Sequence, residues 1–188
     1  MRESTLWTTK YQFANIFLAH LEAIGISFVF LAAAFYLLMT KYIFREILSV
    51  IFMTVYFGVV YSRAHKFATL DKKPYTKTRP SLFKGFMFGL MLSFSFFVVW
   101  GIYKLMWINF GQEGMLSSVG AGIYSIFFWM YTIPFNGIMG LAKGHIMWYA
   151  LLSMFLVPVL ATTLGYYAGL KNFRLMDKIG NLAYEKED

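Results

Sequence analysis

The stretch Gly85–Phe110 (GFMFGLMLSFSFFVVWGIYKLMWINF) decides the fold class of this 188-residue chain. Lys104 is its only charged residue, and its length exceeds the roughly 20 residues that a helix needs to cross a bilayer. The stretch is too long for a transmembrane barrel strand, and hydrophobic and polar residues do not alternate along it. Residues 85–110 are therefore expected to form a membrane-spanning helix.

Four further hydrophobic segments accompany this one, at residues 11–39, 43–62, 119–141 and 146–170. Hydrophobic residues make up 59 % of the chain and charged residues 14 %, whereas about 25 % of a soluble domain is charged. This composition excludes a disordered or collagen-like chain and fits a soluble enzyme domain poorly. We expect residues 1–188 to form a single domain, an all-α integral membrane protein with a bundle of four to five transmembrane helices.

The fourth segment, residues 119–141, is the weakest candidate for a span. It contains Pro134, Asn136, Gly137 and Gly140, and proline and glycine interrupt or weaken a helix. Such a segment is either a Pro-kinked span or a broken, re-entrant or interfacial element whose freed backbone groups are covered by protein. If the helix breaks, Asn136 is a candidate for lining a polar cavity.

Lysine and arginine are concentrated in the connection 63–84, which holds seven of them against one acid. Cytoplasmic connections of membrane proteins are enriched in Lys and Arg, so this connection and the N-terminus are expected in the cytoplasm. The tail 171–188 is cytoplasmic if the number of spans is even and external if it is odd.

Some of these basic residues are also candidates for contact with anionic lipid head groups or an acidic partner, with a purely topological role as the alternative. They are Lys72, Lys73, Lys77 and Arg79. Nucleic-acid binding is not expected, because no folded module displays the basic residues on one face.

Two ionisable side chains, His20 and Glu22, lie inside the first hydrophobic segment. An ionised carboxylate in hydrocarbon costs several kcal/mol unless it is paired, hydrated or protonated. Glu22 is therefore a candidate proton, ion or substrate site, with His20 as a second titrating group. The alternative is an ion pair between Glu22 and a Lys or Arg.

Helical spacing arranges the polar and small residues of the first segment in two stripes, both of which we expect to be buried. One stripe contains Gln12, Asn15, Ala19 and Glu22, and the other contains His20, Ala23 and Ser27. Asn15 is accordingly a further polar candidate within the membrane.

Small residues that recur every four positions predict close helix–helix contacts, because they let two backbones approach in lipid. Gly85, Gly89 and Ser93 form such a row at the start of the third segment, and Gly165 and Gly169 follow the same spacing in the fifth.

No catalytic or metal-binding motif is present. The chain lacks cysteine, its three His lie in separate segments, and it contains no zinc-protease, nucleophile-elbow, Walker or dinucleotide signature. We expect neither a cofactor nor a metal.

The favoured hypothesis is a non-enzymatic membrane subunit of a larger, transport-related complex, whose partners are the lipid bilayer and other membrane subunits or further copies of the chain. The alternatives are a self-contained homo-oligomeric transporter or channel with Glu22 in its pathway, and an intramembrane lipid-modifying enzyme.

Two parts of the sequence carry a resemblance. One is Arg63–Leu90, and the other begins with LVPVLATTLGYYAGLKN at Leu156 and continues to Lys178. Together they resemble a group of small polytopic membrane proteins of Gram-positive bacteria whose function is not established. The resemblance implies a bacterial plasma membrane, a cytoplasmic C-terminal tail and an even number of spans.

Overall fold

The computed structural model describes residues 9–33, 42–73, 78, 80–110, 115–135 and 148–173. All regular elements within these residues are helices, which confirms the expected all-α class. They are α1 (Thr9–Ala33), α3 (Tyr42–Asp71), α4 (Leu82–Phe110), α5 (Met115–Tyr131), the 3₁₀ turn η1 (Ile133–Phe135) and α6 (Trp148–Leu170).

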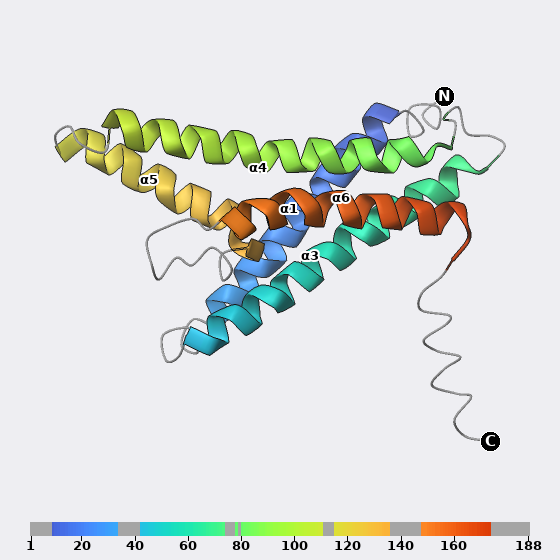
Figure 1. The fold of residues 1–188 in the computed structure, drawn as a ribbon, viewed down its shortest axis with the longest axis horizontal. Coiled ribbons are helices and arrows are strands. Elements are labelled where there is room, and N and C mark those ends of the chain that lie inside the picture. The colour runs from blue at the N-terminus through green and yellow to red at the C-terminus, as the bar shows by residue number, and fades with distance from the viewer. Residues whose placement is uncertain are drawn as a thin grey trace, which may run out of the picture.

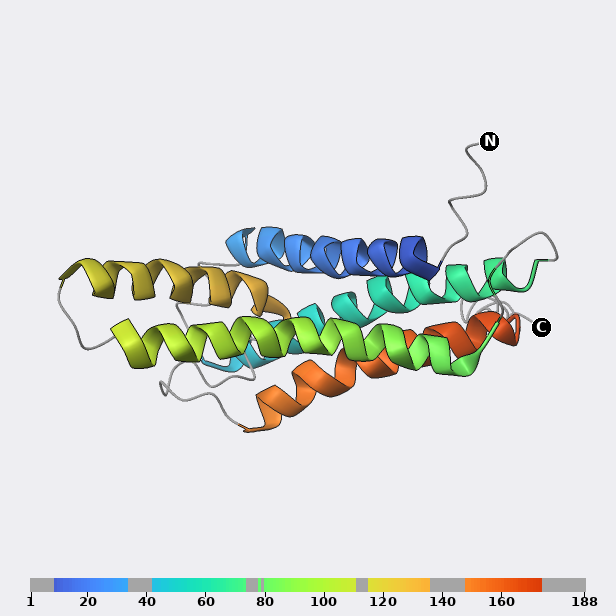
Figure 2. The same ribbon diagram turned by 90° about the horizontal axis from the view of Figure 1, so that it is seen from above.

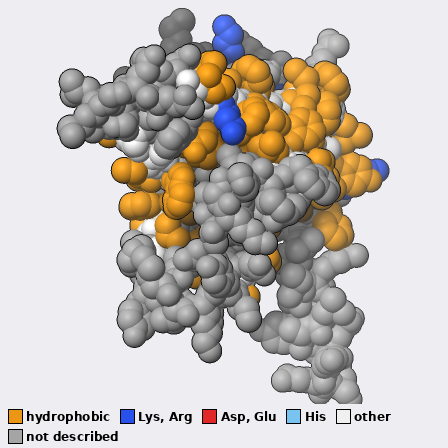
Figure 3. All heavy atoms as spheres, turned by 60° about the vertical axis from the view of Figure 1, so that its left-hand side comes forward, with side chains coloured by type: hydrophobic (Ala, Val, Ile, Leu, Met, Phe, Trp, Pro, Cys, Tyr) orange, Lys and Arg blue, Asp and Glu red, His pale blue; other side chains and the backbone are white. Residues whose placement is uncertain are grey.

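Among the described residues, four helices are long and apolar enough to cross a membrane, as in a multi-pass membrane protein. The candidate spans are Thr9–Leu31, Ile47–Asp71, Leu82–Met106 and Leu151–Leu170. Hydrophobic side chains cover most of the described surface in the view of Figure 3. This surface agrees with helices that face lipid rather than water.

Helix α6 packs mainly against α3 and α4, and α1 packs mainly against α3 (Figure 1). Helix α5 folds back along α4, as Figure 2 shows from above. The buried core lies where these helices meet and is rich in aromatic side chains, including Tyr56, Phe88, Phe96, Phe128 and Phe135.

Helix α3 continues to Asp71, so the connection that was expected to begin at residue 63 begins about two turns later. Ala64, Phe67 and Ala68 are buried in this extension and continue the inward face of α3 at helical spacing. Burial of these apolar side chains holds residues 63–71 in the helix although the segment is rich in basic residues.

The fourth hydrophobic segment is broken, as one of the sequence alternatives expected. Helix α5 ends at Tyr131, and η1 follows with Ile133, Pro134 and Phe135 all buried. Proline has no backbone N–H and its ring clashes with the preceding turn, which disfavours continuation of α5 through Pro134, although α6 does continue through Pro158. Asn136, Gly137 and Gly140 lie outside the described residues.

The row Gly85, Gly89 and Ser93 lies against α6. A Cβ at Gly85 would lie 2.6 Å from Tyr166 Cβ, and one at Gly89 would lie 2.5 Å from the Cα of Val159. Ser93 donates a 2.9 Å hydrogen bond to the backbone carbonyl of Phe155. Helices α4 and α6 are therefore in contact at the level of their backbones over this row.

Glycines of α6 make the same kind of approach to α3. A Cβ at Gly165 would lie 2.5 Å from the carbonyl oxygen of Tyr61, and one at Gly169 would lie 2.5 Å from that of His65. Just beyond Gly169, Asn172 adopts a left-handed conformation with φ of 54°. The amide of Phe173 then bonds the carbonyl of Ala168, which closes α6 with a Schellman motif.

Candidate functional site

A buried carboxylate, Asp71 at the end of α3, joins four other parts of the chain. Its side chain is fully buried and lies 2.5 Å from Nζ of Lys84 in α4. It also accepts a 2.6 Å hydrogen bond from Nε2 of Gln12 in α1, and further bonds from the hydroxyls of Thr78 and Tyr166. We call these five residues the Asp71 cluster.

The Asp71 cluster places one negative charge where positive charge and hydrogen-bond donors converge. Lys84 neutralises the carboxylate, and donors from α1, α4, α6 and Thr78, which lies between α3 and α4, satisfy its oxygens. A buried charge is tolerated only with such pairing and hydrogen bonding. The arrangement therefore fixes the relative positions of α1, α3, α4 and α6 at one end of the bundle.

A second polar group lies near the middle of the spans, where His20 of α1 contacts two tyrosines. Its Nδ1 lies 2.8 Å from the hydroxyl of Tyr56 in α3, and its Nε2 lies 2.9 Å from that of Tyr131 in α5. Tyr131 in turn donates a 2.8 Å hydrogen bond to Ser95 of α4. We call these four residues the His20 cluster.

The donors and acceptors of the His20 cluster can be assigned one after another, and this assignment determines which ring nitrogen of His20 carries the proton. Ser95 donates to the carbonyl of Leu92, so Tyr131 must donate to Ser95 and must accept from Nε2 of His20. The Nδ1 atom then accepts from Tyr56. A neutral imidazole satisfies every bond in this chain. His20 thus links α1, α3, α4 and α5 without carrying charge.

Apolar side chains separate the two clusters. On the inward face of α3, the residues between Tyr56 and Asp71 are Val60, Ala64, Phe67 and Ala68, all buried. On α1, Ile16 and Ala19 lie between Gln12 and His20 and are fully buried. The two clusters are therefore separate hydrogen-bonded groups. The buried residues between them on α1 and α3 could not pass a proton or an ion from one cluster to the other.

Removal of the imidazole should destabilise the bundle modestly. In His20→Leu the hydroxyl of Tyr56 loses its partner, whereas Tyr131 keeps Ser95. We expect a loss of about 1–2 kcal/mol in the free energy of unfolding, measured by sodium dodecyl sulfate titration of the protein in micelles. His65→Leu is the control, because the His65 ring lies outside the His20 cluster, where it stacks on Tyr61 and contacts the carbonyl of Phe173. Equal losses in the two variants would contradict the proposed role of His20.

Glu22 lies outside both clusters, on the outer surface of α1. Its carboxylate accepts a 2.8 Å hydrogen bond from Arg63 of α3, and the Glu22 and Arg63 side chains are 52 % and 30 % exposed. The expectation of two buried stripes on α1 is therefore wrong. The buried face centres on Ile16, Ala19 and Ala23, with Gln12, His20 and Ser27 beside them, and Glu22 points about 100° away from its centre.

Two other predicted polar residues, Asn15 and Lys72, form hydrogen bonds within the chain. The amide of Asn15 donates to the carbonyl of Tyr11 in its own helix, at 3.2 Å. Lys72 donates to the carbonyl of Leu170 and the side chain of Asn172, at 2.9 and 2.8 Å. Lys72 thus binds the C-terminal end of α6, where a cation is favoured by the helix dipole. Lys73 is exposed just after α3, and Lys77 and Arg79 lie outside the described residues.

Comparisons of the chain with protein-family models, with curated proteins and with solved structures give no match. The geometry of the described residues therefore carries the functional argument.

One feature of the sequence marks Asp71 as a buried residue. Asp71 is the one acid in the basic connection, and it lies seven residues after Ala64 and three after Ala68, which places it on the buried face of α3. Tyr56, Tyr131 and Tyr166 carry no comparable signal, because tyrosine is common both at membrane interfaces and in cores. Within the described residues, His, Asp and Glu side chains form no group of three that could hold a metal.

Proposed function

We propose that this chain is a non-enzymatic, multi-pass subunit of a larger membrane assembly that serves transport. The observation that carries the proposal is the Glu22–Arg63 ion pair, which lies on the outer surface of α1 and α3 within two candidate spans. Transport is the favoured role of the assembly, because ionisable side chains within spans are typical of proteins that move ions or substrates.

The depth of the ion pair makes its exposure costly in a bilayer. A helix rises about 1.5 Å per residue, so Glu22 lies about 14 Å from the Leu31 end of its span and Arg63 about 12 Å from the Asp71 end of its span. An ionised side chain at the middle of a span costs about 2.5–3.5 kcal/mol on insertion scales. Polar groups of a neighbouring membrane protein would remove much of this cost by covering the pair.

The surface around the pair suits a neighbouring helix. Leu18 and Ile26 flank Glu22 on α1 and are 52 % and 38 % exposed. Gly25, three residues after Glu22 on α1, is also exposed, and a Cβ at this position would meet nothing within 4 Å. Small residues of this kind allow close approach between helices in lipid.

The two enclosed clusters favour a subunit over a self-contained transporter with Glu22 in its pathway. Glu22 faces outward, and the Asp71 and His20 clusters are separated by apolar side chains on α1 and α3. The four candidate spans among the described residues support the even-span topology. We accordingly assign the N-terminus, the basic connection and the C-terminal tail to the cytoplasmic side of a bacterial plasma membrane.

Cross-linking from the α1 surface tests the proposal. A photo-activatable amino acid at Leu18 or Ile26 should give a discrete protein adduct in native membranes, whereas one at Phe94 of α4, which is 68 % exposed, should give none. Arg63→Gln removes the ion-pair partner of Glu22 and leaves its charge unpaired at the proposed interface. We therefore expect this variant to form much less adduct. Lys66→Gln, an exposed change three residues further along α3, is the matched control.

The proposal fails if positions 18 and 94 give the same products, or if position 18 gives lipid adducts alone. It also fails if the purified chain is a monomer that transports a solute by itself in liposomes.

A further inference from the structure

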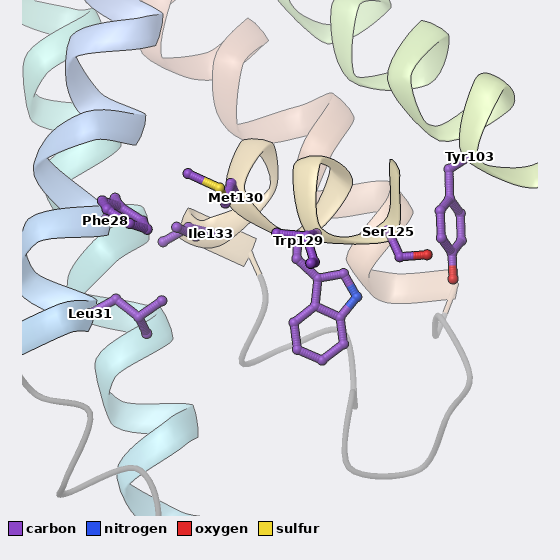
Figure 4. A pocket seen from close by; sticks show the side chains of 8 residues that line it. Phe28, Leu31, Tyr103, Ser125, Trp129, Met130 and Ile133 are labelled. Atoms are coloured by element: carbon purple, nitrogen blue, oxygen red, sulfur yellow. The ribbon is translucent and has the colours of Figure 1, made fainter. Parts of the chain in front are cut away.

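A cavity of about 510 Å³ lies between α1, α4 and α5. We propose that it binds one acyl chain of a membrane lipid. This inference does not rest on the subunit role of the chain. Residues that line the cavity include Phe28, Leu31, Tyr103, Ser125, Trp129 and Ile133 (Figure 4).

The walls match the chemistry of an alkyl chain. Figure 4 shows Phe28, Leu31 and Ile133 on one side of the cavity, with Tyr103 and Ser125 on the other. Most of the lining is hydrocarbon and aromatic ring, and the hydroxyls of Tyr103 and Ser125 add a small polar region. An apolar lining with few polar groups is the usual composition of a site that binds a small hydrophobic molecule.

The size of the cavity selects a chain rather than a helix. An apolar cavity of about 150 Å³ binds benzene, so by proportion about 510 Å³ holds on the order of 15–20 carbon atoms. That is the length of one ordinary acyl chain. A helix is about 10 Å wide with its side chains, so a single turn would fill the same volume. More than one turn of a partner helix therefore does not fit inside this cavity.

Lipid has direct access to the cavity. Phe28, Ile126, Trp129 and Met130 line it and are also 43 %, 63 %, 45 % and 41 % exposed. Helix α5 packs mainly on α4 and contacts α1 only sparsely, which leaves the space between α1 and α5 open at the side. An acyl chain from the surrounding bilayer can enter through this side without leaving a hydrophobic environment.

The order of residues along the helices orients the lipid. His20, Ser95 and Tyr131 meet near the middle of the spans, and Tyr103 lies eight residues beyond Ser95, about 12 Å further out. Ser125 lies about 9 Å outward from Tyr131 by the same rise. The hydroxyls thus lie toward the membrane surface, where the ester groups lie, at about the level of Phe28, eight residues after His20. Met130 and Ile133 lie nearer the membrane centre, so the end of an entering chain points to the centre.

Photolabelling of the full-length chain tests the site without any substitution. The probe is a phosphatidylcholine with a diazirine in its acyl chain, incorporated in phosphatidylcholine vesicles. Labelling should concentrate on Phe28, Trp129 and Met130, above Val29 and Phe94, which are more exposed at 67 % and 68 % but do not line the cavity. Labelling in proportion to exposure, or protein adducts at Trp129 in native membranes, would overturn the proposal.

Filling the cavity provides the second test. Ser125→Phe places an aromatic ring inside it, whereas Ile123→Phe adds bulk to an exposed position of the same helix outside it. Labelling of Phe28 should fall about tenfold in Ser125→Phe and remain unchanged in Ile123→Phe. Far-ultraviolet circular dichroism of each variant checks that the bundle is folded. Equal labelling of Phe28 in both folded variants, or a fall in Ile123→Phe alone, would refute the site. If Ser125→Phe does not fold, the photolabelling pattern of the unsubstituted chain alone decides whether the site exists.

Discussion

Asp71→Asn is expected to lower the free energy of unfolding by about 3–5 kcal/mol. The substitution removes the charge that neutralises Lys84, whose side chain is only 10 % exposed. If the amide nitrogen takes the place of Oδ2, it also presents a donor to Lys84 and to the hydroxyl of Tyr166, which both donate to that atom. The loss is measured by sodium dodecyl sulfate titration in micelles, followed by circular dichroism.

A double-mutant cycle separates the ion pair from the rest of the Asp71 cluster. Lys84→Met leaves the carboxylate without its cation, so this variant should also be strongly destabilised. The double variant Asp71→Asn/Lys84→Met contains no buried charge at this position and should lose less than the sum of the two single variants, by about 1–3 kcal/mol. Additive losses, or a loss below about 1 kcal/mol for Asp71→Asn, would show that the pair does not hold the bundle together.

The spans were predictable from the sequence because hydropathy acts over about 20 consecutive residues and needs no knowledge of neighbours. A break in the fourth segment could be predicted as one alternative for a local reason as well, since Pro134 disfavours an α-helix. The sequence did not exclude the kinked span, and α6 does continue through Pro158. The end of α3 could not be predicted in this way. Its last turns are stabilised by burial of Ala64 and Phe67 against other helices. Because the segment is rich in basic residues, its average hydropathy does not reveal this burial.

The polar pairings were much harder to predict. Glu22 and Arg63 are separated by 41 positions, and His20 and Tyr131 by 111, so only the packing of the helices reveals that they meet. Helical periodicity shows which residues of α1 share a face, but it does not show how many faces of α1 are packed against other helices. The sequence therefore identified Glu22 and His20 as unusual, whereas the structure assigns His20 to the core and Glu22 to the outer surface.

Gly89→Leu is expected to lower the free energy of unfolding by about 3 kcal/mol, the upper end of the usual range for overpacking. At this position even a Cβ would lie 2.5 Å from the Cα of Val159 and 2.5 Å from the hydroxyl oxygen of Thr162. Because Val159 contributes backbone rather than a flexible side chain, the conflict can be relieved only by moving α4 and α6 apart. That movement would also lengthen the hydrogen bond from Ser93 to the carbonyl of Phe155.

Gly101→Leu is the matched control on the same helix. A Cβ at Gly101 would meet nothing within 4 Å, and leucine favours a helix over glycine by up to about 1 kcal/mol. This variant should therefore be as stable as the unchanged chain or slightly more so in the same titration. If Gly89→Leu and Gly101→Leu behave alike, contact between the α4 and α6 backbones cannot be what holds these helices together. A selective loss in Gly89→Leu instead means that this side of the bundle depends on close packing, since the substitution removes no hydrogen-bonding or charged group from the Asp71 cluster or from α6.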